Sequence, residues 1–290
     1  MKWFDYARPY SIGEAVQLLS GAGEKARVLA GGTDLLVQLR ADRKQAELVV
    51  DVKRIREMNE INYNPEKGLA LGAAVPCYQI YGNSSLREKY PALAEVASII
   101  GGTQIQGRAS IGGNLCNAAP SADSVPLLIA LRARCRIAGV AGEREVPVEE
   151  FCTAPGRTIL KPGELLVSLL FPSPARGEGA CYIRFIPRNE MDIAVAGAGV
   201  DVVIDDGVIR SARVALASVA PTPLFVREAG ESLAGSAAGA DAIQRAAEIA
   251  QQAAKPITDM RGTADYRRHL CAVLVRRALH AAIQRAREAR

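Results

Sequence analysis

The sequence predicts an α+β fold, in which a two-part α/β domain precedes a C-terminal α+β domain with an antiparallel sheet and helices. Strand, turn, helix and strand patterns follow one another within residues 26–52, which is the order of a parallel βαβ unit. Residues 172–177, rich in Pro and Gly, are the best linker candidate in the chain. Beyond them strand patterns come first and helix patterns follow, as in an α+β domain. We therefore expect subdomains over residues 1–57 and 58–175, and a C-terminal domain over residues 178–290.

The first subdomain is predicted to contain two helices and two strands. Ser11 is placed to cap a helix that ends near two glycines. An apolar strand over residues 26–30 leads into a glycine pair, after which Thr33 is expected to cap a helix over residues 34–42. A second apolar strand over residues 48–52 completes the βαβ unit.

The second subdomain is predicted as another α/β unit with an unusual segment at its centre. Residues 108–123 combine Gly, Ala, Ser, Asn and Asp without a continuous apolar face, so we expect a loop there. Helix and strand patterns lie on both sides of it. The expected elements are a strand over 69–73, a helix over 91–100, a helix over 124–131, and strands over 133–138 and 165–170.

The C-terminal domain is predicted to begin with three antiparallel strands. The Asp-Asp-Gly sequence at residues 205–207 is a strong hairpin signal between the last two of them. Two helix patterns follow this sheet. The expected elements are strands over 182–186, 193–204 and 208–219, and helices that begin at Asp241 and Thr263.

Composition and charge exclude several classes of protein. The six cysteines of the 290 residues form no CxxC pair and there are only two histidines, which argues against a zinc site or a cysteine-ligated iron–sulfur cluster in this chain. No apolar run approaches a membrane span and no signal-peptide pattern opens the chain, so we expect a cytoplasmic protein. The net charge of +5 is mild. Because the basic residues of 261–290 alternate with Glu on a helix pattern, we expect a helix surface there and not a nucleic-acid site.

The first glycine pair lies where a predicted strand ends, in the sequence Ala-Gly-Gly-Thr-Asp at residues 30–34. Paired glycines permit positive φ angles and have no Cβ, so that backbone N–H groups can approach a phosphate closely. The start of a helix after Thr33 would add a favourable dipole. Taken alone, the pair is also compatible with an ordinary turn between strand and helix.

The second glycine pair lies in Ser-Ile-Gly-Gly-Asn at residues 110–114, nine residues before Asp123. Its small and amide-bearing residues favour close approach to a polar ligand. Two separate anion-binding loops fit a dinucleotide, which has two phosphates, better than a mononucleotide. The G-x-G-x-x-G pattern of a Rossmann site is not present, so nicotinamide is not the first choice.

These residues carry a family resemblance that covers nearly the whole chain. AGGTDLL at residues 30–36 and ASIGGNLCNAAPSADSVPLL at residues 109–128 are similar to the two FAD loops of the molybdenum hydroxylase flavin subunits. That family includes the medium subunit of carbon monoxide dehydrogenase and the FAD domain of xanthine dehydrogenase. The resemblance implies a PCMH-type FAD-binding domain. Further pieces occur in the family's order at residues 162–166, 188–194, 266–268 and 273–279.

The resemblance also implies which residues surround FAD. Two segments would surround the pyrophosphate with their backbone amides, namely Val28, Leu29, Ala30, Gly31, Gly32, Thr33, Asp34 and Leu35, and Ser110, Ile111, Gly112, Gly113 and Asn114. Asp123 would bond the ribityl or adenosine part, and Leu166 would contact the adenine. Arg184 stands where xanthine dehydrogenase has a flavin-contacting lysine, and Asp192 falls in a loop beside the flavin ring. Ile100 or Gly101 replaces an aromatic ring of that relative, so stacking on the flavin would have to come from elsewhere.

Simpler interpretations exist for three of these residues. Asp123 precedes a predicted helix and is compatible with an N-cap, a contact worth about 1 kcal/mol. Arg184 is compatible with an ordinary strand-edge residue. Asp192 is compatible with a surface ion pair to Arg188, which would contribute little free energy.

By the resemblance, the chain is the electron-transferring FAD subunit of a larger oxidoreductase. Electrons would come from two [2Fe–2S] clusters on a small subunit, after hydroxylation of the substrate at a molybdenum cofactor on a large subunit. The flavin would pass them to an external acceptor, and the assembly would be a dimer of heterotrimers. We expect no acid–base dyad, nucleophile or metal ligand in this chain. The alternatives are a self-contained FAD oxidase of the same wider fold and a flavin-free assembly scaffold.

Overall fold

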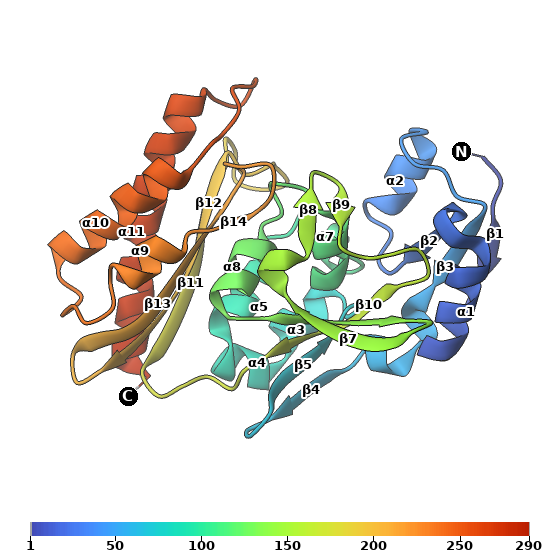
Figure 1. Cartoon of the computed structure of the whole chain (residues 1–290), viewed down its shortest axis with the longest axis horizontal. Coiled ribbons are helices and arrows are strands. Elements are labelled where there is room, and N and C mark those ends of the chain that lie inside the picture. The colour runs from blue at the N-terminus through green and yellow to red at the C-terminus, as the bar shows by residue number, and fades with distance from the viewer. Residues whose placement is uncertain (1, 290) are drawn as a thin grey trace.

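The computed structural model describes residues 2–289, which form three main sheets that follow one another along the molecule, and a small two-stranded sheet of β8 and β9 (Figure 1). The first is a parallel sheet with strand order β1–β3–β2, so the predicted βαβ unit is confirmed. Ser11 caps α1 as expected, because its side chain accepts from the Glu14 N–H group. The elements are β1 (Asp5–Ala7), α1 (Ile12–Ala22), β2 (Ala26–Leu29), α2 (Leu35–Arg40) and β3 (Leu48–Asp51).

The expected cap and length of the second helix are wrong. Asp34, not Thr33, is the N-cap residue of α2, and its side chain makes no capping hydrogen bond. The helix ends at Arg40, where the Ala41 N–H group bonds two carbonyls of the last turn. Thr33 instead remains in the loop between β2 and α2.

The second sheet is antiparallel, with strand order β4–β5–β10–β6–β7. The predicted α/β unit is therefore an α+β arrangement, because β10 pairs antiparallel with both β5 and β6. Helices cover this sheet on the side that faces the third sheet (Figure 1). The elements are β4 (Ile61–Asn64), β5 (Gly68–Gly72), α3 (Cys77–Gly82), α4 (Ser84–Lys89), α5 (Pro91–Ser98), α6 (Thr103–Gln106), α7 (Ile111–Asn117), α8 (Ser124–Ala130), β6 (Arg134–Gly139), β7 (Gly142–Pro147), β8 (Cys152–Ala154), β9 (Arg157–Thr158) and β10 (Leu165–Phe171).

The C-terminal part is an antiparallel sheet of order β11–β12–β13–β14 with long helices on one face, as predicted (Figure 1). The hairpin between β12 and β13 is confirmed, and Asp206 and Gly207 have φ angles of 48° and 78°. Thr263 caps the last helix by accepting from the Tyr266 N–H group. The elements are β11 (Glu178–Phe185), β12 (Ala196–Asp205), β13 (Val208–Ala217), β14 (Leu224–Phe225), α9 (Arg227–Glu231), α10 (Ala240–Ala253) and α11 (Ala264–Glu288).

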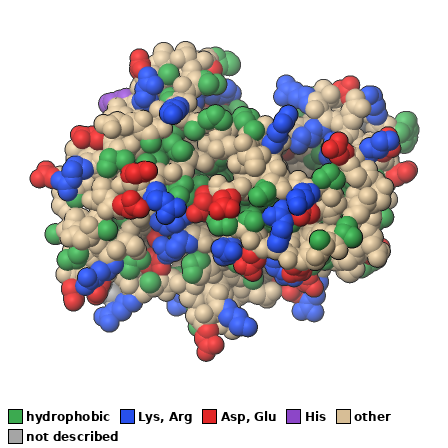
Figure 2. Space-filling view, viewed as in Figure 1, with side chains coloured by type: hydrophobic (Ala, Val, Ile, Leu, Met, Phe, Trp, Pro, Cys, Tyr) green, Lys and Arg blue, Asp and Glu red, His purple; other side chains and the backbone are tan. Residues whose placement is uncertain are grey.

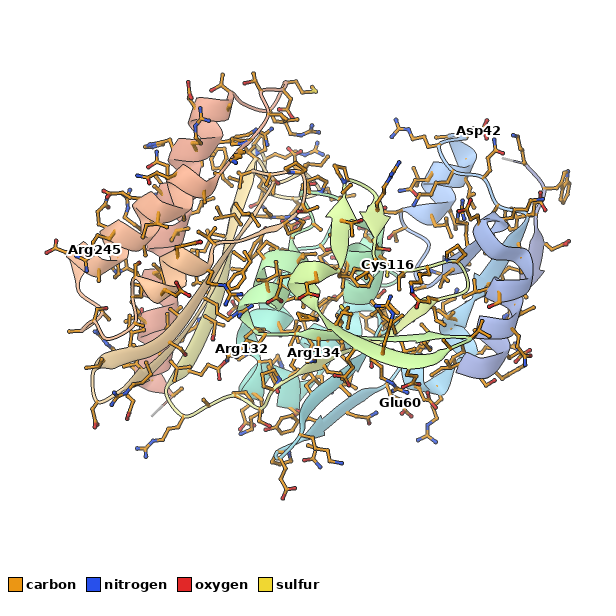
Figure 3. All side chains as sticks on the ribbon, in the orientation of Figure 1. Asp42, Glu60, Cys116, Arg132, Arg134 and Arg245 are labelled. Carbon is orange, nitrogen blue, oxygen red and sulfur yellow. The ribbon has the colours of Figure 1, made fainter. Side chains whose placement is uncertain are left out.

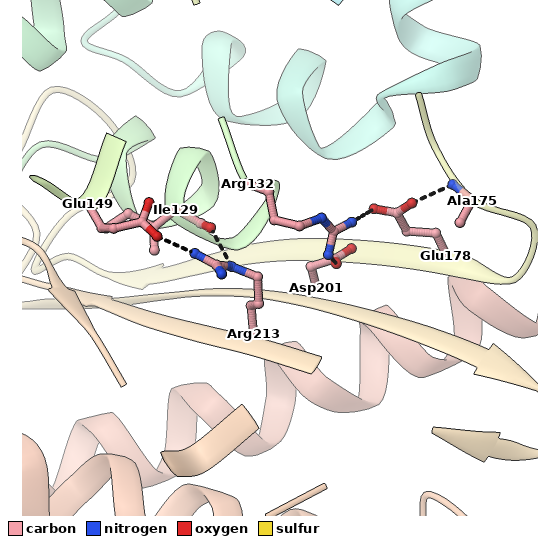
Figure 4. A network of polar contacts seen from close by, with 7 residues as sticks. All are labelled: Ile129, Arg132, Glu149, Ala175, Glu178, Asp201 and Arg213. Atoms are coloured by element: carbon pink, nitrogen blue, oxygen red, sulfur yellow. Dashed lines mark hydrogen bonds and ion pairs between the residues drawn. The ribbon is translucent and has the colours of Figure 1, made fainter. Parts of the chain in front are cut away.

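Two large clusters of buried side chains form the core. One lies among the elements from α1 to β10, and the other lies between the C-terminal sheet and helices α10 and α11. Arg132 and Arg213 join the two parts through ion pairs at their junction (Figure 4). None of the helices within residues 2–289 is both long and apolar enough to cross a bilayer.

Candidate functional site

A cavity of about 1240 Å³ lies between the first two sheets and the loop that connects β11 to β12, and we call it the main cavity. Its walls come from the β2–α2 loop, α7, residues 156–166 and the loop before β12. The surface is hollowed between the N-terminal part and the rest of the molecule (Figure 2), and Cys116 of α7 lies near this hollow (Figure 3). The cavity is thus built from segments that are far apart in the sequence.

Most of the residues that the sequence predicted for the site line this cavity. They are Val28, Ala30, Gly31, Gly32, Thr33, Asp34, Leu35, Ile100, Gly101, Ser110, Gly112, Gly113, Asn114, Asp123, Leu166 and Asp192. Three predicted residues do not line it. Leu29 and Ile111 are buried in the core, at 8% and 1% exposure. Arg184 donates a hydrogen bond to the cavity residue Asp123 but does not line the cavity itself.

The first glycine pair forms a loop whose backbone donors are free. Among the residues that the structure describes, the N–H groups of residues 31–35 have no hydrogen-bond acceptor. Gly32 has a φ angle of 77°, in the left-handed region that favours glycine. A Cβ on Gly31 would collide with the carbonyl group of Arg108, so this position needs glycine for space. Successive free N–H groups in such a turn form a concave site for an anion.

The second glycine pair lies in a helix, so the expected loop is wrong at this point. Ser110 caps α7 by accepting the Gly113 N–H group at 3.0 Å, and neither Gly112 nor Gly113 has a positive φ angle. Ile111 and Leu115 bury their side chains in the core and stabilise this helix in spite of its glycines.

The two glycines of α7 have different neighbours. A Cβ on Gly112 would lie 2.7 Å from both Cα and Cβ of Ala73, whereas one on Gly113 would meet only the Ser110 hydroxyl, at 3.0 Å. Gly112 therefore allows the helix to pack against the β5–α3 connection. Gly113 keeps the wall of the cavity clear of side-chain atoms.

Asp123 is held by two residues of β11. Its Oδ1 accepts from the Tyr182 hydroxyl at 2.8 Å, and its Oδ2 accepts from Arg184. Burial raises the pKa of Asp123, and Arg184 and Tyr182 oppose this shift. The N-cap interpretation is wrong, because the Asp123 side chain makes no capping bond. Arg184 does lie on an edge strand, but its side chain is only 9% exposed and points to the site carboxylate.

Ile100, Gly101 and Asp192 also line the cavity. The expected pair between Asp192 and Arg188 is present at 3.7 Å, and the Ile193 N–H group also bonds the Asp192 carboxylate at 2.8 Å. The described residues that line the cavity include no aromatic side chain and no histidine. This wall can therefore pack against a ring but offers no stacking partner.

Sequence reasoning missed the cations of the cavity. Lys44 lines it and, within the described part of the chain, has no ion-pair partner. Burial lowers the pKa of Lys44, and the nearby Arg27, which also lines the cavity, lowers it further. Burial likewise raises the pKa of Asp34 on the same wall. No local pattern marks Lys44, because it lies in an ordinary connection after α2.

Comparison with known proteins bears on the same segments. Residues 2–174 match the family model described as the FAD binding domain in molybdopterin dehydrogenase, and residues 182–282 match that of the CO dehydrogenase flavoprotein C-terminal domain. The chain is 35% identical to the carbon monoxide dehydrogenase medium chain of Afipia carboxidovorans, over 98% of both chains. It is 30% identical to the xanthine dehydrogenase FAD-binding subunit of Escherichia coli O157:H7, over 97% of both.

Solved structures agree with these matches. A chain of the reconstituted CO dehydrogenase from Oligotropha carboxidovorans superposes with a TM-score of 0.94 at 34% identity, covering 98% of this chain and 99% of that one. A chain of quinoline 2-oxidoreductase from Pseudomonas putida 86 has a TM-score of 0.90 at 28% identity, with 99% of both chains covered. The chain therefore belongs to the family of FAD-binding subunits of molybdopterin dehydrogenases of the carbon monoxide and xanthine dehydrogenase type.

Proposed function

We propose that this chain is the electron-transferring FAD subunit of a molybdenum hydroxylase complex, with FAD bound in the main cavity. The observation that carries the proposal is the set of free N–H groups at residues 31–35, which face the same cavity as α7 and Lys44. At about 1240 Å³ the cavity exceeds the roughly 300–1,000 Å³ usual for small-molecule sites. An elongated dinucleotide accounts for both the size and the unpaired donors.

The residues present fit the parts of FAD. The free amides of residues 31–35 and the clear wall at Gly113 suit the pyrophosphate, and Lys44 supplies a positive charge for it. Leu166 provides an apolar wall for the adenine, and the fixed carboxylate of Asp123 accepts from the hydroxyls of the sugar or ribityl chain. When bound, FAD supplies one-electron and two-electron redox chemistry. This chain then has to bind and orient the cofactor.

The flavin end fits a protein that passes electrons onward. Ile100 and Gly101 form a small apolar wall without proton-transferring side chains. Asp192, tied to Arg188, places a carboxylate at this end, where its charge would act on the ring. Substrate chemistry would then occur on other subunits.

The family supports a proposal for the partners. A relative of this chain is named the medium chain of carbon monoxide dehydrogenase. We propose a large molybdenum-cofactor subunit and a small subunit with [2Fe–2S] clusters as partners, in a cytoplasmic dimer of heterotrimers. We also propose domain boundaries after residues 57 and 175, which separate the three sheets.

Purification of the tagged full chain from its native host cells tests the proposed partner subunits. We expect two further subunits in a constant ratio, together with molybdenum and iron in the complex. Mass spectrometry identifies the subunits, and elemental analysis measures the metals. A monodisperse flavoprotein that oxidises an organic substrate unaided would contradict the proposal and favour a self-contained oxidase.

A further inference from the structure

Lys53 contacts the first glycine loop but is not one of the residues that line the main cavity. It belongs to the short helical turn Val52–Arg54 that follows β3. Its Nζ donates to the carbonyl oxygen of Ala30 at 3.2 Å and pairs with the Asp51 carboxylate at 2.8 Å.

Asp51 is the ion-pair partner of this ammonium group. Its side chain is only 3% exposed, and it also accepts from the Tyr6 hydroxyl and from the Lys53 N–H group, the latter at 3.0 Å. Burial alone would raise the pKa of Asp51, but the hydrogen bonds from Lys53 and Tyr6 outweigh it and keep the pKa below its ordinary value. The carboxylate therefore stays charged at neutral pH and forms an ion pair with Lys53.

The contact to Ala30 determines the direction of the next N–H group. In a planar trans peptide the C=O and N–H groups point in opposite directions. Because the Ala30 carbonyl points to Lys53, the Gly31 N–H group points to the other side, where Gly31 lines the cavity. A positive charge on the carbonyl also polarises the peptide, so that the N–H group becomes a stronger donor.

We propose that Lys53 is a positioning residue for the cofactor phosphates, because it orients and polarises the Ala30–Gly31 peptide. This inference rests on the proposed function, in which the amides of residues 31–35 bind the FAD pyrophosphate. It predicts a split between two variants of one ion pair. Lys53→Met removes the charge from the Ala30 carbonyl, whereas Asp51→Asn weakens the pair but leaves the ammonium group near that carbonyl.

The test is a fluorescence titration of the deflavinated full chain with FAD, together with thermal unfolding of the FAD-free variants. Lys53→Met should raise the Kd for FAD about tenfold, the effect of one charge-assisted contact. Lys53→Arg should restore the affinity to within about threefold of the wild type, because it keeps a charged donor. Asp51→Asn should lower the unfolding temperature yet change the Kd by less than about threefold.

Lys25→Met is the matched control, because it breaks the exposed pair with Glu47, at 2.8 Å, in the same sheet region. Lys25→Met should change neither the Kd for FAD nor the unfolding temperature. If Lys53→Met does not fold, Lys53→Gln replaces it with the same expectation. Equal losses of affinity in Lys53→Met and Asp51→Asn would reduce the contact to a structural ion pair and overturn the inference. A folded Lys53→Met variant that binds FAD with wild-type affinity would also overturn the inference. A wild-type chain that does not bind FAD would instead refute the proposed function itself.

Discussion

Two regions of the molecule differ in whether their polar groups have hydrogen-bond partners within the protein. At the junction with the C-terminal sheet, Arg132 bonds Asp201 at 2.9 Å and Glu178 at 2.6 Å, and Arg213 bonds Glu149 at 2.8 Å (Figure 4). At the main cavity, the N–H groups of residues 31–35 have no acceptor within the described part of the chain. The two guanidinium groups of the junction are paired with carboxyl groups of the protein, whereas the N–H groups on the cavity wall are free to bond a ligand.

The largest effect on stability should come from Arg132→Met at the junction. The change leaves the Glu178 carboxylate without its cation and removes the hydrogen bond to the carboxyl group of Asp201, which is fully buried. Breaking a buried ion pair in this way costs about 3–5 kcal/mol. Urea unfolding of the FAD-free chain measures the loss, and the Kd for FAD should remain unchanged.

Arg210→Met is the control for this change, because its pair with Asp205 is exposed. It should cost less than about 1 kcal/mol. Equal losses for the two variants would show that the junction pairs contribute no more than surface pairs do.

Gly112→Ala should have the next largest effect, again on stability. The added Cβ would lie 2.7 Å from Cα of Ala73, so the helix or the β5–α3 connection has to move. Overpacking of this kind costs about 1–3 kcal/mol. Thermal unfolding of the FAD-free form checks the change. Unaltered stability would mean that the two segments separate more easily than their packing indicates.

Gly113→Ala should affect binding and not folding. Its Cβ would meet only the Ser110 hydroxyl, and Ala favours a helix over Gly by about 1 kcal/mol, so the FAD-free form should be at least as stable as the wild type. The methyl group would project into the cavity, and we expect the Kd for FAD to rise about tenfold or more, since about 1.4 kcal/mol corresponds to tenfold. Lower stability with undiminished affinity would return this glycine to a purely structural role.

The smallest effect is the pH dependence of Asp201. Burial raises the pKa of Asp201, and the nearby Glu178 raises it further. The native state therefore retains a proton that the unfolded chain releases above about pH 4, so this stabilisation is present in acid and lost as the pH rises. Asp201→Asn should flatten this loss of stability as the pH rises above about 4. Urea unfolding across this range measures it, with Asp205→Asn as an exposed control that should not flatten it.

Local signals predicted the elements whose ends are determined by neighbouring residues. Ser11 caps α1, Thr263 caps α11, and the Asp-Asp-Gly turn closes the β12–β13 hairpin. Each of these features depends on residues within four positions of one another. The two glycine pairs also identified the walls of the cavity, because small residues are required wherever backbone approaches backbone or a ligand closely.

The remaining features depend on contacts between distant segments. The second sheet is antiparallel because β10 inserts between β5 and β6, which no local pattern specifies. Helix α7 forms despite two glycines because the core accepts Ile111 and Leu115. Asp123 is not a cap because Tyr182, 59 residues further along the chain, donates a hydrogen bond to its carboxylate. Lys44 and Lys53 were missed because their roles come from their position in space.

Identification of the released flavin tests whether the chain binds FAD. The purified full chain is denatured by heat, and the released flavin is separated chromatographically and quantified against the protein. We expect one FAD per chain and no FMN, because two separated segments surround a cavity suited to a dinucleotide. Release of FMN, or a chain that binds no flavin after incubation with FAD, would contradict it.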